Sequence, residues 1–180
     1  MHNLRPIHSI EDIPTKYQNT PIGLLLEFHN LNKKPALFED AQLLIGMCID
    51  NRKQLNLPEN FAYVLRSPGA NFDQDAFAIS YAVLVGEVRY IALIGHNDCG
   101  MVQLAHKRET FLKGLEEVGN WEKGKAIEFY ESNLIEYGLE NEIDILIRQA
   151  TEFRGLYPKV ITVPMLYRVE DKKLFLIENN

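Results

Sequence analysis

Four short stretches without polar alternation constrain the fold of this chain more than any other feature. They occupy residues 43–49, 61–66, 90–94 and 159–163, and turn-forming or polar residues follow the first three. Apolar stretches of this length, without a period of two, are typical of strands buried on both faces of a parallel sheet. Helical patterns separate them, so the sequence predicts an α/β domain with a mainly parallel central sheet flanked by helices.

Capping residues predict where three of the helices begin. Thr20 precedes Pro21, the combination of a capping hydroxyl and a first-turn proline, and we expect this helix to end near Asn30. Asp73 is expected to cap a second helix, and Asn141 a third. The expected apolar faces consist of Phe77, Tyr81, Leu84 and Val85 in the second helix, and of Ile143, Leu146, Ile147, Ala150 and Phe153 in the third.

The length of 180 residues suits one domain, which we expect to cover residues 1–180. Residues 1–19 are expected to form an N-terminal arm suited to packing on a partner subunit, and residues 167–169 and 174–177 a terminal hairpin. No apolar run resembles a signal peptide or a membrane span, so a cytoplasmic location is expected. The formal charge of -6 argues against a general nucleic-acid binder.

The two cysteines of the chain lie at or just after predicted strand ends. Two cysteines exclude a disulfide scaffold and a four-thiolate zinc site. Cys48 ends the first strand, while Cys99 follows the third, three residues after His96. Ligand sites form at the carboxyl ends of parallel strands, so these three side chains can meet there. Two thiolates and an imidazole suit zinc, and a set of three protein ligands is typical of catalytic zinc sites.

Asp50 and Arg52 follow Cys48 closely and add chemistry to this site. Asp50 either ligates the metal or accepts a hydrogen bond from a metal-bound water, and Arg52 is suited to hold it ionised through a bidentate ion pair. Taken singly, each residue has an ordinary interpretation: a small buried thiol, a solvated turn or a hydrogen-bonded loop histidine. Their combination at two compatible strand ends favours the metal site.

Two short motifs resemble those of the β-class carbonic anhydrases. Cys48-Ile49-Asp50-Asn51-Arg52 is similar to the family's Cys-x-Asp-Ser-Arg motif, and His96-Asn97-Asp98-Cys99-Gly100 to its His-x-x-Cys-Gly motif. Asp98-Cys99-Gly100-Met101 is most similar to the short, archaeal-type branch of that class. The resemblance extends from about residue 41 to the end of the chain.

Weaker similarities and two departures accompany these motifs. Arg66-Ser67-Pro68-Gly69 lies where the family has Arg-Asn-Ala-Gly, while residues 141–158 and 163–174 resemble a later helix and the closing strand segment. Asn51 replaces the usual serine, and its amide can both donate and accept. Pro68 removes a backbone donor and stiffens the loop beside the expected substrate cleft.

The resemblance implies a zinc-dependent carbonic anhydrase that reversibly hydrates carbon dioxide to bicarbonate. By motif position, Cys48, His96 and Cys99 would hold Zn²⁺, and Asp50 and Arg52 would be the catalytic dyad. Zinc makes hydroxide available near neutral pH. Family members work as homodimers or larger homo-oligomers with the active-site cleft at the subunit interface. The residues expected to line the substrate pocket are Gly69, Ala70 and Phe72.

Two other functions remain open from the residues. The altered Ser67-Pro68 loop is compatible with a related zinc hydrolase of carbonyl sulfide or carbon disulfide. Asn51 and the same loop are also compatible with a weakly active or non-catalytic zinc-binding protein. A cysteine phosphatase is disfavoured because Gln54 and Ala105 stand where its phosphate-binding arginine would follow either cysteine.

Overall fold

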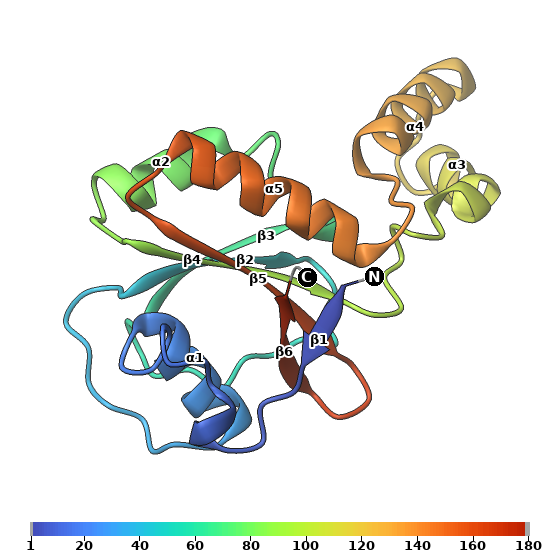
Figure 1. The fold of residues 1–180 in the computed structure, drawn as a ribbon. Coiled ribbons are helices and arrows are strands. Elements are labelled where there is room, and N and C mark those ends of the chain that lie inside the picture. The colour runs from blue at the N-terminus through green and yellow to red at the C-terminus, as the bar shows by residue number, and fades with distance from the viewer. Residues whose placement is uncertain (1, 179–180) are drawn as a thin grey trace.

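A six-stranded sheet organises the protein in the computed structural model, which describes residues 2–178 (Figure 1). The strand order is β1-β6-β5-β4-β2-β3. Strands β2 to β5 are parallel, whereas β6 is antiparallel to β5 and β1 is antiparallel to β6. The strands are β1 (Asn3–Arg5), β2 (Leu43–Cys48), β3 (Ala62–Ser67), β4 (Tyr90–His96), β5 (Ile161–Arg168) and β6 (Lys173–Glu178). The predicted α/β class with a mainly parallel sheet is confirmed.

Helices cover both faces of this sheet (Figure 1). Helix α1 lies on one face, α2 and α5 lie on the other, and the α3–α4 pair projects beyond the end of the sheet. The helices are α1 (Pro21–Asn30), α2 (Ala76–Leu84), α3 (Arg108–Glu117), α4 (Lys123–Tyr137) and α5 (Glu142–Leu156). Short 3₁₀ turns occur at Ile10–Asp12, Pro68–Ala70 and Leu104–Lys107. None of the helices within residues 2–178 is long and apolar enough to cross a membrane.

Two apolar cores, one on each face of the sheet, explain why the central strands lack polar alternation. All six residues of β2 are buried, and so are the last six of β4. Leu44 and Leu93 pack with α2 and α5, while Ile45 and Ile94 pack with α1. A strand covered on both faces must be apolar at successive positions, as the sequence indicated.

The path of the chain brings the ends of β2 and β4 together. Strand β3 lies at the edge of the sheet beyond β2, so the chain then returns across β2 to form β4. Met47 consequently pairs with Ile94, and the two strands end side by side. A reversal of strand order of this kind leaves room at the carboxyl ends, where α/β proteins bind ligands.

Local capping signals fix the starts of α1 and α5 as predicted. The Thr20 hydroxyl accepts a hydrogen bond from the Gly23 amide at 3.4 Å, and Pro21 is the first residue of α1. The side chain of Asn141 accepts hydrogen bonds from the amides of Ile143 and Asp144. Both helices therefore begin where a side chain replaces a missing backbone acceptor.

The prediction for α2 was wrong in both its cap and its buried face. Asp75 occupies the N-cap position, whereas Asp73 accepts a hydrogen bond from Arg148 of α5. The face that is buried consists of Ile79, Ala82 and Val83. The predicted face is exposed instead, at Phe77 (83%), Tyr81 (50%), Leu84 (69%) and Val85 (62%). Helix α2 is apolar on more than one side, so periodicity alone could not identify the side that contacts the sheet.

The two ends of the chain also differ from the prediction. The prediction divided this region into a strand over residues 159–163 and the first half of a hairpin over residues 167–169. In the structure residues of both belong to one strand, β5, which continues through Pro164 and pairs with β6. Residues 3–5 add β1 to the sheet, and Ile7 and Ile13 are buried in the core of the same chain. Part of the expected arm therefore packs on its own domain, and its packing on a partner subunit stays a prediction.

Candidate metal centre

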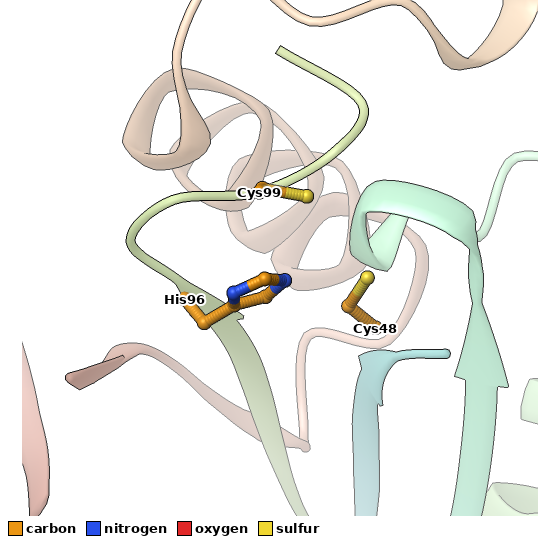
Figure 2. Close-up of side chains that lie close together, drawn as sticks. All are labelled: Cys48, His96 and Cys99. Carbon is orange, nitrogen blue, oxygen red and sulfur yellow. The ribbon is translucent and has the colours of Figure 1, made fainter. Parts of the chain in front are cut away.

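Cys48, His96 and Cys99 form one cluster at the carboxyl ends of β2 and β4 (Figure 2). Their ligand atoms, two sulfurs and one imidazole nitrogen, all lie within 4.8 Å of one another. All three residues are buried, and neither cysteine forms a disulfide. The structure thus brings together the three side chains that the sequence proposed as one site.

The imidazole of His96 is oriented for metal binding. Its Nδ1 lies 2.8 Å from the carbonyl oxygen of Asn97, so Nδ1 carries the proton and Nε2 has a free lone pair. Nε2 is buried and has no hydrogen-bond partner among the described residues. In Figure 2 the ring points towards the same space as the side chains of Cys48 and Cys99. A backbone carbonyl that fixes the tautomer in this way is typical of metal-ligating histidines.

The loop after β4 is held by contacts from two other elements. The side-chain amide of Asn97 donates to Glu170, and its oxygen accepts from the Val169 amide, which ties the loop to the β5–β6 connection. The Cys99 amide donates to Glu142 at the start of α5, at 3.2 Å. These contacts fix the cysteine relative to the sheet.

The two thiols differ in acidity because they lie against each other. The Cys99 thiol and, secondarily, His96 lower the pKa of Cys48 below its ordinary value. The same contact with Cys48, together with burial, raises the pKa of Cys99. The pair of thiols therefore loses its first proton easily, from Cys48, and holds the second proton tightly, on Cys99. A cation bound between the sulfurs would replace the retained proton, because thiolates are the form that binds metal.

Asp50 and Arg52 form the ion pair expected from their spacing. Both carboxylate oxygens of Asp50 accept hydrogen bonds from the guanidinium, the shorter one at 2.7 Å, and the Arg52 amide donates to the same carboxylate. Arg52 is the main reason that the pKa of Asp50 lies well below its usual range. Oδ2 of the same carboxylate also lies 3.8 Å from Nε2 of His96, so the ionised group borders the cluster.

Three residues that contribute to this arrangement were not predicted to do so. Asp98 accepts a hydrogen bond from the opposite end of Arg52, at 2.7 Å, so one guanidinium is shared by two carboxylates. Arg66 donates to the backbone carbonyls of Cys48 and Lys53 and braces the loop after β2. Lys53 is completely buried with its ammonium 3.8 Å from Asp50. In the sequence, only its position next to Arg52 indicated that Lys53 could lie near the site.

Gly69, Ala70 and Phe72 lie in the turn that follows β3 and are buried. Ala70 and Phe72 belong to the same apolar cluster as Cys48 and Cys99. The Phe72 ring covers Gly46, where an added Cβ would lie 2.8 Å from the ring. Gly69 has a φ of 65°, a conformation that favours glycine. Their role in lining a substrate pocket stays a prediction.

The donor set of the cluster fits zinc. Two buried thiols and an imidazole nitrogen without a partner are soft and borderline ligands that zinc accepts with tetrahedral geometry. Among residues 2–178 three such ligands converge, so a fourth position would remain for water or for Asp50. The sulfur and nitrogen atoms argue against magnesium or calcium, which prefer oxygen ligands.

Comparison with known proteins identifies the family. The family model described as "Carbonic anhydrase" matches residues 47–140, which include both cysteine motifs. This chain therefore belongs to the β-class carbonic anhydrase family. A comparison with curated protein sequences found no significant match.

Solved structures support the same fold. A carbonic anhydrase from Glaciozyma antarctica is 18% identical with a TM-score of 0.62, covering 91% of this chain and 99% of its own. A β-carbonic anhydrase, isoform I, from the protozoan Trichomonas vaginalis is 19% identical with a TM-score of 0.64, covering 83% and 90%. An apo carbon disulfide hydrolase is 16% identical with a TM-score of 0.54, covering 75% and 77%. At these identities the likeness establishes the fold.

Proposed function

We propose that this protein is a zinc-dependent carbonic anhydrase that interconverts carbon dioxide and bicarbonate. The observation that carries the proposal is the convergence of Cys48, His96 and Cys99 beside an Asp50–Arg52 ion pair in a chain of this family. Zinc held by these ligands would make hydroxide available near neutral pH. We also propose that the chain acts as a single domain of the short, archaeal-type branch, a placement supported by residues 98–101 alone.

The protein's own residues have distinct tasks in this reaction. Cys48, His96 and Cys99 would hold the metal, and the carbonyl of Asn97 keeps the His96 lone pair directed at it. Asp50, kept ionised by Arg52, is placed to accept a hydrogen bond from the attacking water and so to orient it towards carbon dioxide. A proton is released to solvent with each bicarbonate formed, since hydration of carbon dioxide yields both.

Carbon dioxide is uncharged and has no hydrogen to donate, so its pocket can be largely apolar. We propose Gly69, Ala70 and Phe72 as the wall of this pocket, supported by the place of Ala70 and Phe72 in the apolar cluster that also holds the two cysteines and by the burial of Gly69. Pro68 at the start of this turn would restrict its movement.

Metal content and carbon dioxide hydration, measured on the same purified sample, test this function. The wild type should contain about one zinc per chain and accelerate hydration in stopped-flow assays with a pH indicator. Cys48→Ser should lose zinc and activity together, whereas Asp50→Asn should keep zinc but lose rate, because it retains all three proposed ligands. Zinc-loaded wild type that does not hydrate carbon dioxide at pH 8.5 would refute the proposal.

A related activity on carbonyl sulfide or carbon disulfide is the second candidate, favoured by the altered Ser67-Pro68 turn. Both gases are linear and uncharged like carbon dioxide. Release of hydrogen sulfide by the zinc-loaded protein distinguishes this activity, and its absence with both gases would exclude it. Zinc binding without either reaction would instead support a non-catalytic zinc-binding role.

We propose that the protein works as a homodimer or larger homo-oligomer, as the family does. The support is an exposed apolar surface on edge strand β3 and helix α2, formed by Tyr63, Val64, Phe77, Tyr81, Leu84 and Val85. Large apolar patches on a soluble protein mark interaction sites. Two copies of the chain could cover this patch by packing it against itself across a two-fold axis.

Light scattering after gel filtration tests the oligomer. The wild type should have the mass of at least two chains, and Phe77→Asp should shift it towards the monomer. Val118→Asp is the matched control, because Val118 is also exposed (90%) but follows α3, away from this surface. A monomeric wild type would refute the proposal.

We also propose a cytoplasmic location, supported by two unpaired thiols that a reducing compartment would keep available for the metal.

A further inference from the structure

Lys53 places a buried positive charge beside the candidate metal centre. Its side chain is fully buried, and its Nζ has no hydrogen-bond partner among residues 2–178. Its salt-bridge partner in the described structure is Asp50, whose Oδ1 lies 3.8 Å from this nitrogen, and the Cys48 and Cys99 thiols also lie close enough to act on its charge. Lysine is almost never fully buried unless it is paired, so an ammonium in this position needs a physical reason.

The surroundings of Lys53 direct its charge towards Asp50 rather than towards the backbone. The guanidinium of Arg66 already occupies the carbonyls of Cys48 and Lys53, at 3.0 Å and 3.1 Å. These are carbonyls of the loop on which Lys53 itself lies. The Asp50 carboxylate is then the carboxylate that pairs with the ammonium in the described structure.

Asp50 is subject to two competing attractions. Its Oδ2 lies 3.8 Å from the free nitrogen of His96, where a bound metal would attract the carboxylate. Its Oδ1 faces Lys53, and Arg52 holds both oxygens but is also shared with Asp98. A buried cation at Oδ1 therefore adds to the hold of a guanidinium that is only partly committed to Asp50.

We propose that Lys53 is a positioning residue that keeps the Asp50 carboxylate paired with Arg52 and out of the fourth position of the metal held by Cys48, His96 and Cys99. The proposal rests on the zinc site of the proposed function. An apolar side chain at residue 53 would leave Asp50 to Arg52, which is shared with Asp98, and the carboxylate would then compete with water and with small anions for the metal.

Azide binding to the cobalt-loaded protein measures how open that fourth position is, without any catalysis. Cobalt(II) between thiolates absorbs visible light, and the absorption changes when azide replaces water on the metal. Lys53→Met, which preserves the length of the side chain but removes its charge, should weaken azide binding about tenfold or more, because Asp50 now competes. Lys113→Met is the matched control, since it removes an exposed lysine on α3 and should leave azide affinity unchanged.

A second pair of variants separates positioning from direct attraction of the anion. In an Asp50→Asn background, where no carboxylate competes, Lys53→Met should have no effect on azide affinity. In the protein that keeps Asp50, Lys53→Arg, which retains the charge, should give an azide affinity close to that of the wild type. Should Lys53→Met fail to fold by circular dichroism, Lys53→Gln replaces it in the same comparison.

The outcomes are distinct. An unchanged azide affinity in Lys53→Met, or an equal loss with and without Asp50, would overturn the positioning role, the latter by indicating that Lys53 attracts anions directly. Wild-type protein that binds neither zinc nor cobalt would refute the zinc site itself, and the role of Lys53 with it.

Discussion

Histidine 29 should make the fold sensitive to mild acid, because it is buried without a positive charge. The ring lies on α1 with only 8% of the residue exposed, and its Nδ1 accepts a hydrogen bond from the Asn56 amide at 3.1 Å. Burial and, to a smaller extent, the neighbouring charge of Lys173 lower the pKa of His29 to about 4, against the partial opposition of the Lys172 backbone. Replacement by glutamine keeps an acceptor for Asn56 and removes the titration.

The sign and size of the effect follow from the two pKa values. Between pH 6.5 and about 4 the unfolded chain binds a proton at this residue that the folded chain does not, so acid favours unfolding. One pKa unit corresponds to about 1.4 kcal/mol, so the wild type should lose on the order of 2 kcal/mol at this residue by pH 5. Above pH 7.5 His29 is neutral in both states and contributes no pH dependence.

Urea unfolding at pH 7.5 and pH 5.0, in the presence of a chelator, measures this loss. The fall in unfolding free energy should be on the order of 2 kcal/mol larger for the wild type than for His29→Gln, or about 1 M in urea midpoint. Comparing the two pH dependences cancels the cost of the substitution itself and the titration of other groups. Parallel pH dependences for the two proteins between pH 7.5 and 5.0 would refute the reasoning.

Three further predictions concern the sheet, a helix cap and the metal. Gly46→Ala places a Cβ 2.8 Å from the Phe72 ring and should cost about 1–3 kcal/mol in urea unfolding; an unchanged midpoint would contradict the overpacking. Asn141→Ala removes the cap of α5 and should cost about 1 kcal/mol, while Asn133→Ala, an exposed amide on α4, should cost less. Zinc at a hundredfold excess over its dissociation constant should stabilise the wild type by about 2.7 kcal/mol but leave Cys48→Ser nearly unaffected; equal stabilisation of both would contradict binding at this cluster.

The central strands and two helix starts could be predicted because their causes are local in sequence. A strand buried on both faces must be apolar at successive positions, so β2 and β4 are recognisable before their neighbours are known. A capping side chain acts within three residues, so Thr20 and Asn141 mark their helices directly.

The face of α2 and the extent of β5 could not be predicted because their causes lie elsewhere in the chain. Phe77 and Ile79 are both apolar, and only the position of the sheet decides that Ile79 is buried while Phe77 is exposed. Pro164 interrupts the pattern of a strand, yet β5 continues through it because β4 and β6 pair with its two sides. Tertiary context overrides local preference in both cases.

The convergence of Cys48, His96 and Cys99 could be predicted from the sequence, whereas the charged residues around them could not. Cys48 and His96 end neighbouring strands, so topology alone brings them together once a parallel sheet is assumed. Asp98, Arg66 and Lys53 contribute through contacts that depend on where the loops after β2 and β4 turn. Nothing in the spacing of these residues distinguishes a bridging or buried charge from an ordinary surface one.

Charge balance explains why the loop after β2 carries so many cations. Two thiolates neutralise a divalent metal, so the ionised Asp50 would be an uncompensated negative charge at the edge of the core. Arg52 compensates it from solvent but shares its guanidinium with Asp98, whereas Lys53 compensates it from the buried side. The segment of residues 48–53 would therefore supply a metal ligand together with the carboxylate and both balancing cations, and Arg66 holds its backbone in place. Replacing either balancing cation, Arg52 or Lys53, should accordingly change the position of Asp50 more than it changes the fold of the domain.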